Sequence, residues 1–393
     1  MLKIYLVKSA CKNPAEKFNF VKKKQNQMKI TKPIGFLLFA GILFMSLPAC
    51  KNMTHQTTLR SHLVDTVGFA HYPWQMDSLM QRIKRYQGDE LEKRTQYLTP
   101  KTTKAVLCPH DDYSYVGYLY PATLGQIKAH TVIIFGVAHK ARQLHLENKI
   151  IFDSYDYWKG PYGNVKVSNL REKIMENLPK NLYMVNDSMQ AIEHSVEAEI
   201  PWLQYFNRNV QIVSILVPYM SFDRMKAIAG PLAKAIRKAT QSENMQWGKD
   251  FAFVISSDAV HYGDEGWGGQ NFAFYGTACT SYTNAKGHEL EIMHAISGYI
   301  SPGMIHKFCD MTVEASDYHK YKWTWCGRYD VPLGLLTIND LNETLYREPL
   351  HGQVIGYSTS IEHEPIPVKD LRMGVTAPAN DHHWVGYAAI KYY

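Results

Sequence analysis

Apolar runs and amphipathic stretches alternate along most of the chain. Four short runs are rich in apolar and β-branched residues: 104–107, 131–135, 210–217 and 251–256. Runs of this kind are typical of strands that are buried on both faces. Apolar residues recur at helical spacing in five other stretches: 75–86, 120–129, 197–205, 222–239 and 289–297. Two late runs, 353–358 and 384–392, predict further strands, and we expect the last strand to close the sheet.

This order of elements predicts the fold class. Strands that alternate with helices indicate an α/β protein in which helices flank a largely parallel sheet. With 46% hydrophobic residues in 393 positions, the chain can bury one large core. Because no repeat and no break in composition divides it, we predict a single three-layer α/β/α domain over residues 66–393.

Residues 1–49 have the features of a secretory signal sequence. Lys29 and Lys32 form a basic segment, and an apolar run follows at 34–47. This run is shorter than the roughly 20 apolar residues that a membrane-spanning helix needs. Met28 is an alternative start, because the segment that it opens already makes a signal of ordinary length.

The signal sequence ends in Leu47-Pro48-Ala49-Cys50, which resembles a bacterial lipobox. Cys50 would then become the lipidated first residue of the mature protein, and residues 50–65 a lipid-anchored tether. Because Pro48 is unusual at its position, ordinary signal-peptidase cleavage nearby stays open as an alternative. We therefore expect a membrane-anchored lipoprotein of a bacterial cell envelope, facing the periplasm or the exterior.

The net charge of +7 does not indicate a nucleic-acid partner, because the excess positive charge lies in the signal sequence. Residues 1–49 contain nine Lys and a single acid, Glu16. The remainder holds 34 basic and 35 acidic side chains. The mature domain is close to neutral, so we expect no nucleic-acid partner.

Polar side chains with metal-binding or catalytic potential follow the predicted strands. In open α/β sheets, ligands bind at the carboxyl ends of the strands. His110 and His139 each follow one of the predicted strands closely, and Asp258 and His261 follow a third. Two more candidates could reach the same edge: His194, which precedes a predicted helix, and Cys326, which precedes an apolar segment.

Each of these residues also has a simpler interpretation. A single His after a strand is usually a hydrogen-bonded loop residue, and Asp258 could cap a following helix or turn. Cys326 could be a small buried hydrophobe, and Arg328 could pair with a carboxylate at the surface. The functional interpretation gains weight because several such residues gather at equivalent strand ends.

Five motifs occur in an order seen in one known family: Pro109-His110-Asp111-Asp112-Tyr113, Gly136-Val137-Ala138-His139, Glu193-His194-Ser195-Val196-Glu197, Ser256-Ser257-Asp258-Ala259-Val260-His261 and Cys326-Gly327-Arg328. The chain resembles the Memo family, known in bacteria as protein B of the AmmeMemoRadiSam system. The resemblance begins near residue 66, because the segment 67–73 also looks like the opening of the family.

This resemblance implies a fold shared with class III extradiol dioxygenases, whose iron is bound by two His and one carboxylate. In Memo-like proteins a Cys replaces the carboxylate. The implied metal ligands are His110, His139 and Cys326, a set that suits iron or copper. The resemblance also implies that His194, Asp258 and His261 line the pocket, where they are candidates for catalytic roles.

The chain departs from the family pattern after His110. The family usually has Ala-Gly there, whereas this chain has Asp111 and Asp112. Either carboxylate could join the metal and restore a dioxygenase-like set of ligands. Alternatively, both could point to solvent and shape a turn, which is the interpretation that we favour.

Two classes of function agree with these residues. The first is a redox metalloprotein or oxygenase-like enzyme that uses a His/His/Cys site, with His194 or His261 as acid or base. The second is a non-catalytic module that binds a metal or a peptide in the same pocket. Both predict a small-molecule or peptide ligand at the strand ends.

Overall fold

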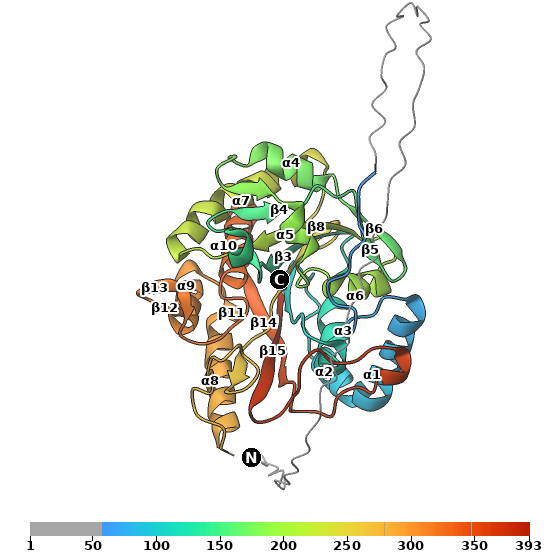
Figure 1. Ribbon diagram of the computed structural model, residues 1–393. Helices are drawn as coiled ribbons and strands as arrows, with labels where there is room; N and C mark the ends of the chain where they lie inside the picture. Colours follow the sequence, from blue (N-terminus) through green and yellow to red (C-terminus); the bar gives the residue numbers. More distant parts are fainter. Residues whose placement is uncertain (1–56, 279, 347) are drawn as a thin grey trace, which may run out of the picture. The chain divides into compact units, whose positions relative to one another are not determined.

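Four parallel strands form the centre of the sheet in a computed structural model of the chain (Figure 1). They lie in the order β8 (Gln211–Val217), β3 (Thr131–Val137), β9 (Phe251–Ser256) and β2 (Ala105–Cys108). All four agree with the predicted runs to within two residues. The structure describes residues 57–393 except 279 and 347, so the predicted signal sequence and Cys50 lie outside the described residues.

Further strands extend this centre to a sheet of thirteen strands. On the β2 side, β15 (His383–Tyr392), β14 (His351–Thr359) and β11 (Gly298–Tyr299) follow in antiparallel order. The expectation that the last strand closes the sheet is wrong, because β15 lies between β2 and β14. The remaining strands of this sheet are β1 (Leu59–Arg60), β4 (Ile150–Phe152), β5 (Tyr157–Gly160), β6 (Gly163–Val167), β7 (Tyr183–Val185) and β10 (His261–Gly263). A separate pair is formed by β12 (Val313–Glu314) and β13 (Asp317–Tyr321).

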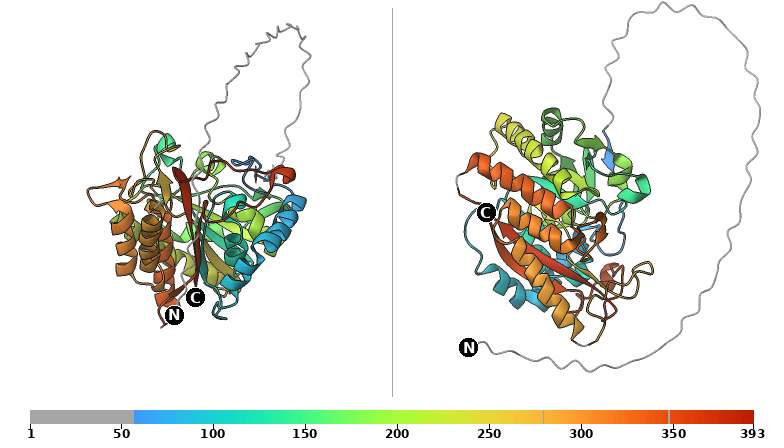
Figure 2. Two further views of the ribbon diagram at one scale, coloured as in Figure 1. Left: turned by 90° about the horizontal axis from the view of Figure 1, so that it is seen from below. Right: turned by 90° about the vertical axis from the view of Figure 1, so that its left-hand side faces the viewer.

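Helices lie on both sides of the sheet, as the left view of Figure 2 shows. One layer contains α4 (Leu170–Asn177), α7 (Phe222–Ser242), α8 (Ser281–Ala295), α9 (Pro302–Thr312) and α10 (Asp330–Leu345). The other contains α1 (Pro73–Thr95), α3 (Leu119–Leu124) and α6 (Glu199–Phe206). Short helical turns complete the described part: α2 (Tyr113–Val116), α5 (Asp187–Ala191), η1 (Ala141–Leu144) and η2 (Lys369–Leu371). The predicted three-layer α/β fold is confirmed.

Two apolar cores follow from the two-residue period of the strands. Side chains such as Leu107, Ile133 and Ile215 pack into the core beneath α7 and α10. Their neighbours Val106, Val132 and Leu216 point to the opposite core beneath α1, α3 and α6. Successive side chains of a strand face opposite sides of the sheet, so a sheet covered on both faces requires continuous apolar runs.

The register of the parallel strands brings their carboxyl ends to one edge. Cys108 of β2 and Gly136 of β3 both pair with Ser256 of β9, and Val137 pairs with Val217 of β8. Residues that follow these positions therefore start from the same level of the sheet. No helix in the described ranges, 57–278, 280–346 and 348–393, has the length and apolar content needed to cross a bilayer.

Candidate metal centre

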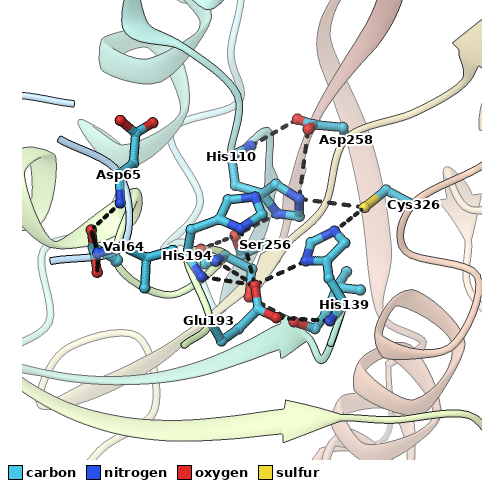
Figure 3. A network of polar contacts seen from close by, with 12 residues as sticks. Val64, Asp65, His110, His139, Glu193, His194, Ser256, Asp258 and Cys326 are labelled. Carbon is cyan, nitrogen blue, oxygen red and sulfur yellow. Dashed lines mark hydrogen bonds and ion pairs between the residues drawn. The ribbon is translucent and has the colours of Figure 1, made fainter. Parts of the chain in front are cut away.

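Three histidines meet at the carboxyl edge of the central strands (Figure 3). His110 lies two residues beyond β2, His139 two residues beyond β3, and His194 between α5 and α6. Their ring centroids are 5.2 Å apart for His110 and His139, 5.4 Å for His110 and His194, and 4.7 Å for His139 and His194. One nitrogen from each ring lies within 4.8 Å of the other two, a spacing that could hold a metal ion.

Cys326 reaches the same point from the segment before α10. Its Sγ lies 2.7 Å from Nε2 of His139 and 3.4 Å from Nε2 of His110. Figure 3 shows the thiol pointing at both rings. The side chain is buried, yet it contacts two imidazole nitrogens rather than apolar neighbours alone. The interpretation of Cys326 as a simple hydrophobe is therefore wrong.

A buried carboxylate fixes the orientation of His139. Glu193 Oε1 accepts from Nδ1 of His139 at 2.9 Å, and Oε2 accepts from the backbone N–H of the same residue at 2.7 Å. The N–H groups of His194 and Ser195 also donate to Oε1. Because Nδ1 donates its proton to Glu193, Nε2 is the nitrogen that faces Cys326.

Ser256 fixes His110 in the same way. The Ser256 hydroxyl donates its single proton to the carbonyl oxygen of Ser195 at 2.6 Å, and a carbonyl oxygen can only accept. The 3.1 Å contact between Ser256 Oγ and His110 Nδ1 therefore requires the imidazole to donate. His110 thus carries its proton on Nδ1 and presents Nε2 to the centre, as His139 does.

Asp258 and His261 lie at the margin of the centre. Asp258 Oδ1 accepts from the backbone N–H of His110 at 2.9 Å, while Oδ2 lies 3.5 Å from Nε2 of His110 and 3.9 Å from Nε2 of His261. The N–H groups of the three residues that follow Asp258 donate to Gly386, Glu289 and Thr324 instead. Asp258 therefore anchors the His110 segment, and the interpretation as a cap is wrong.

The charges of these groups reinforce one another. Burial opposes ionisation of Cys326, but the positive charges of His139 and His110 outweigh it and hold the pKa of the thiol well below its usual range. Burial likewise opposes the charge on His110, yet Asp258 and Cys326 raise its pKa to about 10. By contrast, burial and the charge of His139 lower the pKa of His194 to about 4. The centre therefore combines a thiolate with two imidazoles that a cation would relieve of protons.

The residues present fit a transition-metal ion. Thiolate and imidazole are the donors that iron and copper accept, and both Nε2 atoms face the thiol. His110, His139 and Cys326 would hold such an ion between the two Nε2 atoms and the thiol.

The two aspartates after His110 do not point to solvent, contrary to the interpretation that we favoured. Asp112 is buried, and its Oδ2 accepts from both the N–H and the hydroxyl of Thr376. Asp111 is partly buried, and its Oδ2 accepts from the hydroxyl of Tyr387 at 2.7 Å. Both carboxylates tie the His110 segment to the C-terminal part of the domain.

Several residues important for this arrangement carried no prediction of their own. Glu193 and Ser256 lie inside the quoted motifs, but only the structure shows that they form hydrogen bonds with the rings of His139 and His110. Glu289 is fully buried on α8 and accepts from the indole N–H groups of Trp323 and Trp325, which hold the segment before Cys326. Acidic residues inside apolar helical patterns, such as Glu289, were the available signal.

Fold and site together define the class of protein: a single α/β domain that carries a histidine cluster at the carboxyl ends of its parallel strands. Comparison with known families then identifies it further. The profile of the family described as "Memo-like protein" matches residues 65–367. The chain belongs to the Memo family.

Individual relatives come from archaea. A MEMO1 family protein of Methanosarcina barkeri is 27% identical over 194 residues, which cover 49% of this chain and 64% of the relative. One from Pyrobaculum arsenaticum is 30% identical over 200 residues, with 49% and 66% covered. One from Pyrococcus horikoshii is 24% identical over 293 residues, with 73% and 89% covered. The match thus spans slightly less than two thirds of the first two relatives.

Proposed function

We propose that this chain is a redox metalloprotein with oxygenase-like chemistry, in which His110, His139 and Cys326 hold one iron or copper ion. The observation that carries the proposal is the matched orientation of the two imidazoles. Separate acceptors, Glu193 and Ser256, fix both rings so that each Nε2 faces the same thiol. Preorganisation of this kind is typical of metal ligands.

The bound ion would supply redox chemistry and activation of oxygen or of an organic substrate. The chain's own residues orient that substrate and move its protons. His194 lies against both ligand rings, so it is placed to take or give a proton at a substrate atom beside the ion. Asp258 and His261 border the centre beside His110, where His261 can hold a second proton.

The proposal is tested by elemental analysis of protein purified without oxygen. The wild type should hold close to one iron or copper ion per chain, and both His139→Ala and Cys326→Ala should lose it while they remain folded. Cys309→Ala is a matched control, because Cys309 is also a buried free cysteine but lies in α9, outside the centre. Equal metal content in Cys326→Ala and wild type would refute the proposed ligand set.

A binding module without turnover is the second candidate. The same matched imidazoles and thiol support it, because their orientation prepares a binding site without requiring turnover. Absence of metal from wild type after anaerobic purification and reloading would support this alternative.

We further propose that the signal sequence and Cys50 direct the protein to a bacterial cell envelope. Labelling with a radioactive fatty acid tests this, and the label should be lost in Cys50→Ala.

A further inference from the structure

A cleft with a volume of about 840 Å³ opens beside the metal centre. Its lining includes Arg142, three residues after His139, and Arg328, two residues after Cys326. It also includes Trp267, whose ring lies 5.2 Å from the ring of His261. The cleft is therefore lined by residues that closely follow two candidate ligands in the sequence, and by Trp267, which contacts His261.

Arg328 is the unusual residue of this cleft. Its side chain is only 2% exposed, yet in the described part of the chain no carboxylate forms an ion pair with it. Nη2 donates to the carbonyl oxygen of His319 at 3.3 Å, and the buried Nε has no hydrogen-bond partner in that part. The interpretation of Arg328 as half of a surface ion pair is wrong. A buried guanidinium without a counter-charge is costly unless an anion joins it.

Aromatic rings fix the position of the Arg328 guanidinium but leave its charge available to a ligand. Its carbon lies 3.4 Å from the centre of the Tyr321 ring, and the Arg142 guanidinium lies 4.6 Å from the centre of the Tyr219 ring. Stacking on aromatic faces fixes the planar groups without neutralising their charge. Asp317 also lines the cleft, but its carboxylate contacts Lys320 and His319 instead.

We propose that the cleft binds an oxyanion of the substrate, a carboxylate or a phosphate on a planar group, through Arg328 and Arg142. The guanidinium fork matches two oxygens of such a group, and the aromatic lining covers its planar neighbour. This assignment deepens the proposed function, because the oxyanion would fix the distance between the substrate and the metal centre.

Calorimetry on metal-free protein tests the proposal independently of the ion. Benzoate should bind at least tenfold more tightly than benzamide, its neutral counterpart of the same shape. Arg328→Lys and Arg142→Gln should each weaken benzoate about tenfold, which is the loss expected for a charge-assisted hydrogen bond, and leave benzamide unchanged. Arg142 is exposed, so its variant should fold even if the Arg328 variant does not. Arg82→Gln, which alters an arginine paired with Asp370, is the matched control and should bind like wild type.

Phenyl phosphate in place of benzoate shows which oxyanion the cleft prefers, and tighter binding of either supports the assignment. Equal affinity for benzoate and benzamide, no binding of any anion, or wild-type benzoate affinity in Arg142→Gln would overturn it. The metal content of the same variants separates the two proposals. If the protein binds benzoate but cannot be loaded with iron or copper, the metal centre is refuted and the anion site stands. If the protein holds metal but does not bind benzoate, the anion site is refuted and the metal centre stands.

Discussion

Replacement of Glu193 by Gln tests whether the carboxylate behind His139 prepares the metal centre. The change keeps the shape of the side chain but turns one oxygen into an N–H donor. In the wild type, Oε1 accepts from three donors and Oε2 from one. Whichever of these positions the amide nitrogen of the Glu193→Gln variant occupies, its N–H would face another N–H donor. We expect an unpartnered donor to cost about 1–3 kcal/mol of unfolding free energy.

The larger effect should fall on metal affinity. A ligand imidazole that loses its orienting carboxylate typically loses 10- to 100-fold in affinity, or about 1.4–2.7 kcal/mol. Competition with a coloured chelator measures this loss, and urea unfolding measures stability. Glu197→Gln is the matched control, because Glu197 is equally buried and pairs with Arg60 outside the centre. It should lose stability but keep its metal. Unchanged affinity in Glu193→Gln, or equal losses in both variants, would refute the reasoning.

Two further predictions concern buried polar residues near the centre. Ser256→Ala removes the acceptor for His110 Nδ1, so metal affinity should fall about tenfold in the chelator assay. Ser214→Ala, at another buried serine of the sheet, should not change it. Burial raises the pKa of Glu199 from its ordinary value of 4.5 to about 8. Between these two pH values the folded protein keeps a proton on Glu199, whereas the unfolded chain has released it. Unfolding free energy should therefore fall between about pH 4.5 and pH 8, by a few kcal/mol at most, and Glu199→Gln should flatten this slope in urea titrations. An equally steep slope in the variant would contradict the assignment.

The central strands were predictable because their signal is local. A run such as 251–256 contains only apolar and small residues, and a sheet covered on both faces requires that composition. Helix boundaries were less accurate. The predicted helix 289–297 begins earlier, as α8 at Ser281, and 120–129 contracts to the short α3. The missed helix α10 is almost entirely buried, so it lacks the polar face that marks an amphipathic helix.

For the site, strand-end positions indicated which residues would gather, and the structure brings His110, His139, His194 and Cys326 together. What the sequence could not provide was the orientation of each ring. That orientation depends on acceptors from distant segments, such as Ser256 for His110. Whether Arg328 has a counter-charge depends likewise on which carboxylates pack around it, and only the described structure shows that none forms an ion pair with it.

The position of β15 has a consequence for how the protein matures. Because β15 inserts between β2 and β14, residues 105–107 pair with residues 390–392, which lie far away in the sequence. Pairings between such distant segments form slowly, and until they form the edge of β2 exposes backbone groups that invite other strands. The segment that follows β2 likewise gains the contacts of Asp112 with Thr376 and of Asp111 with Tyr387 only after this distant region has docked. The metal centre should thus be completed late in folding, and substitutions that weaken the pairing of β15 should lower metal binding before they unfold the central strands.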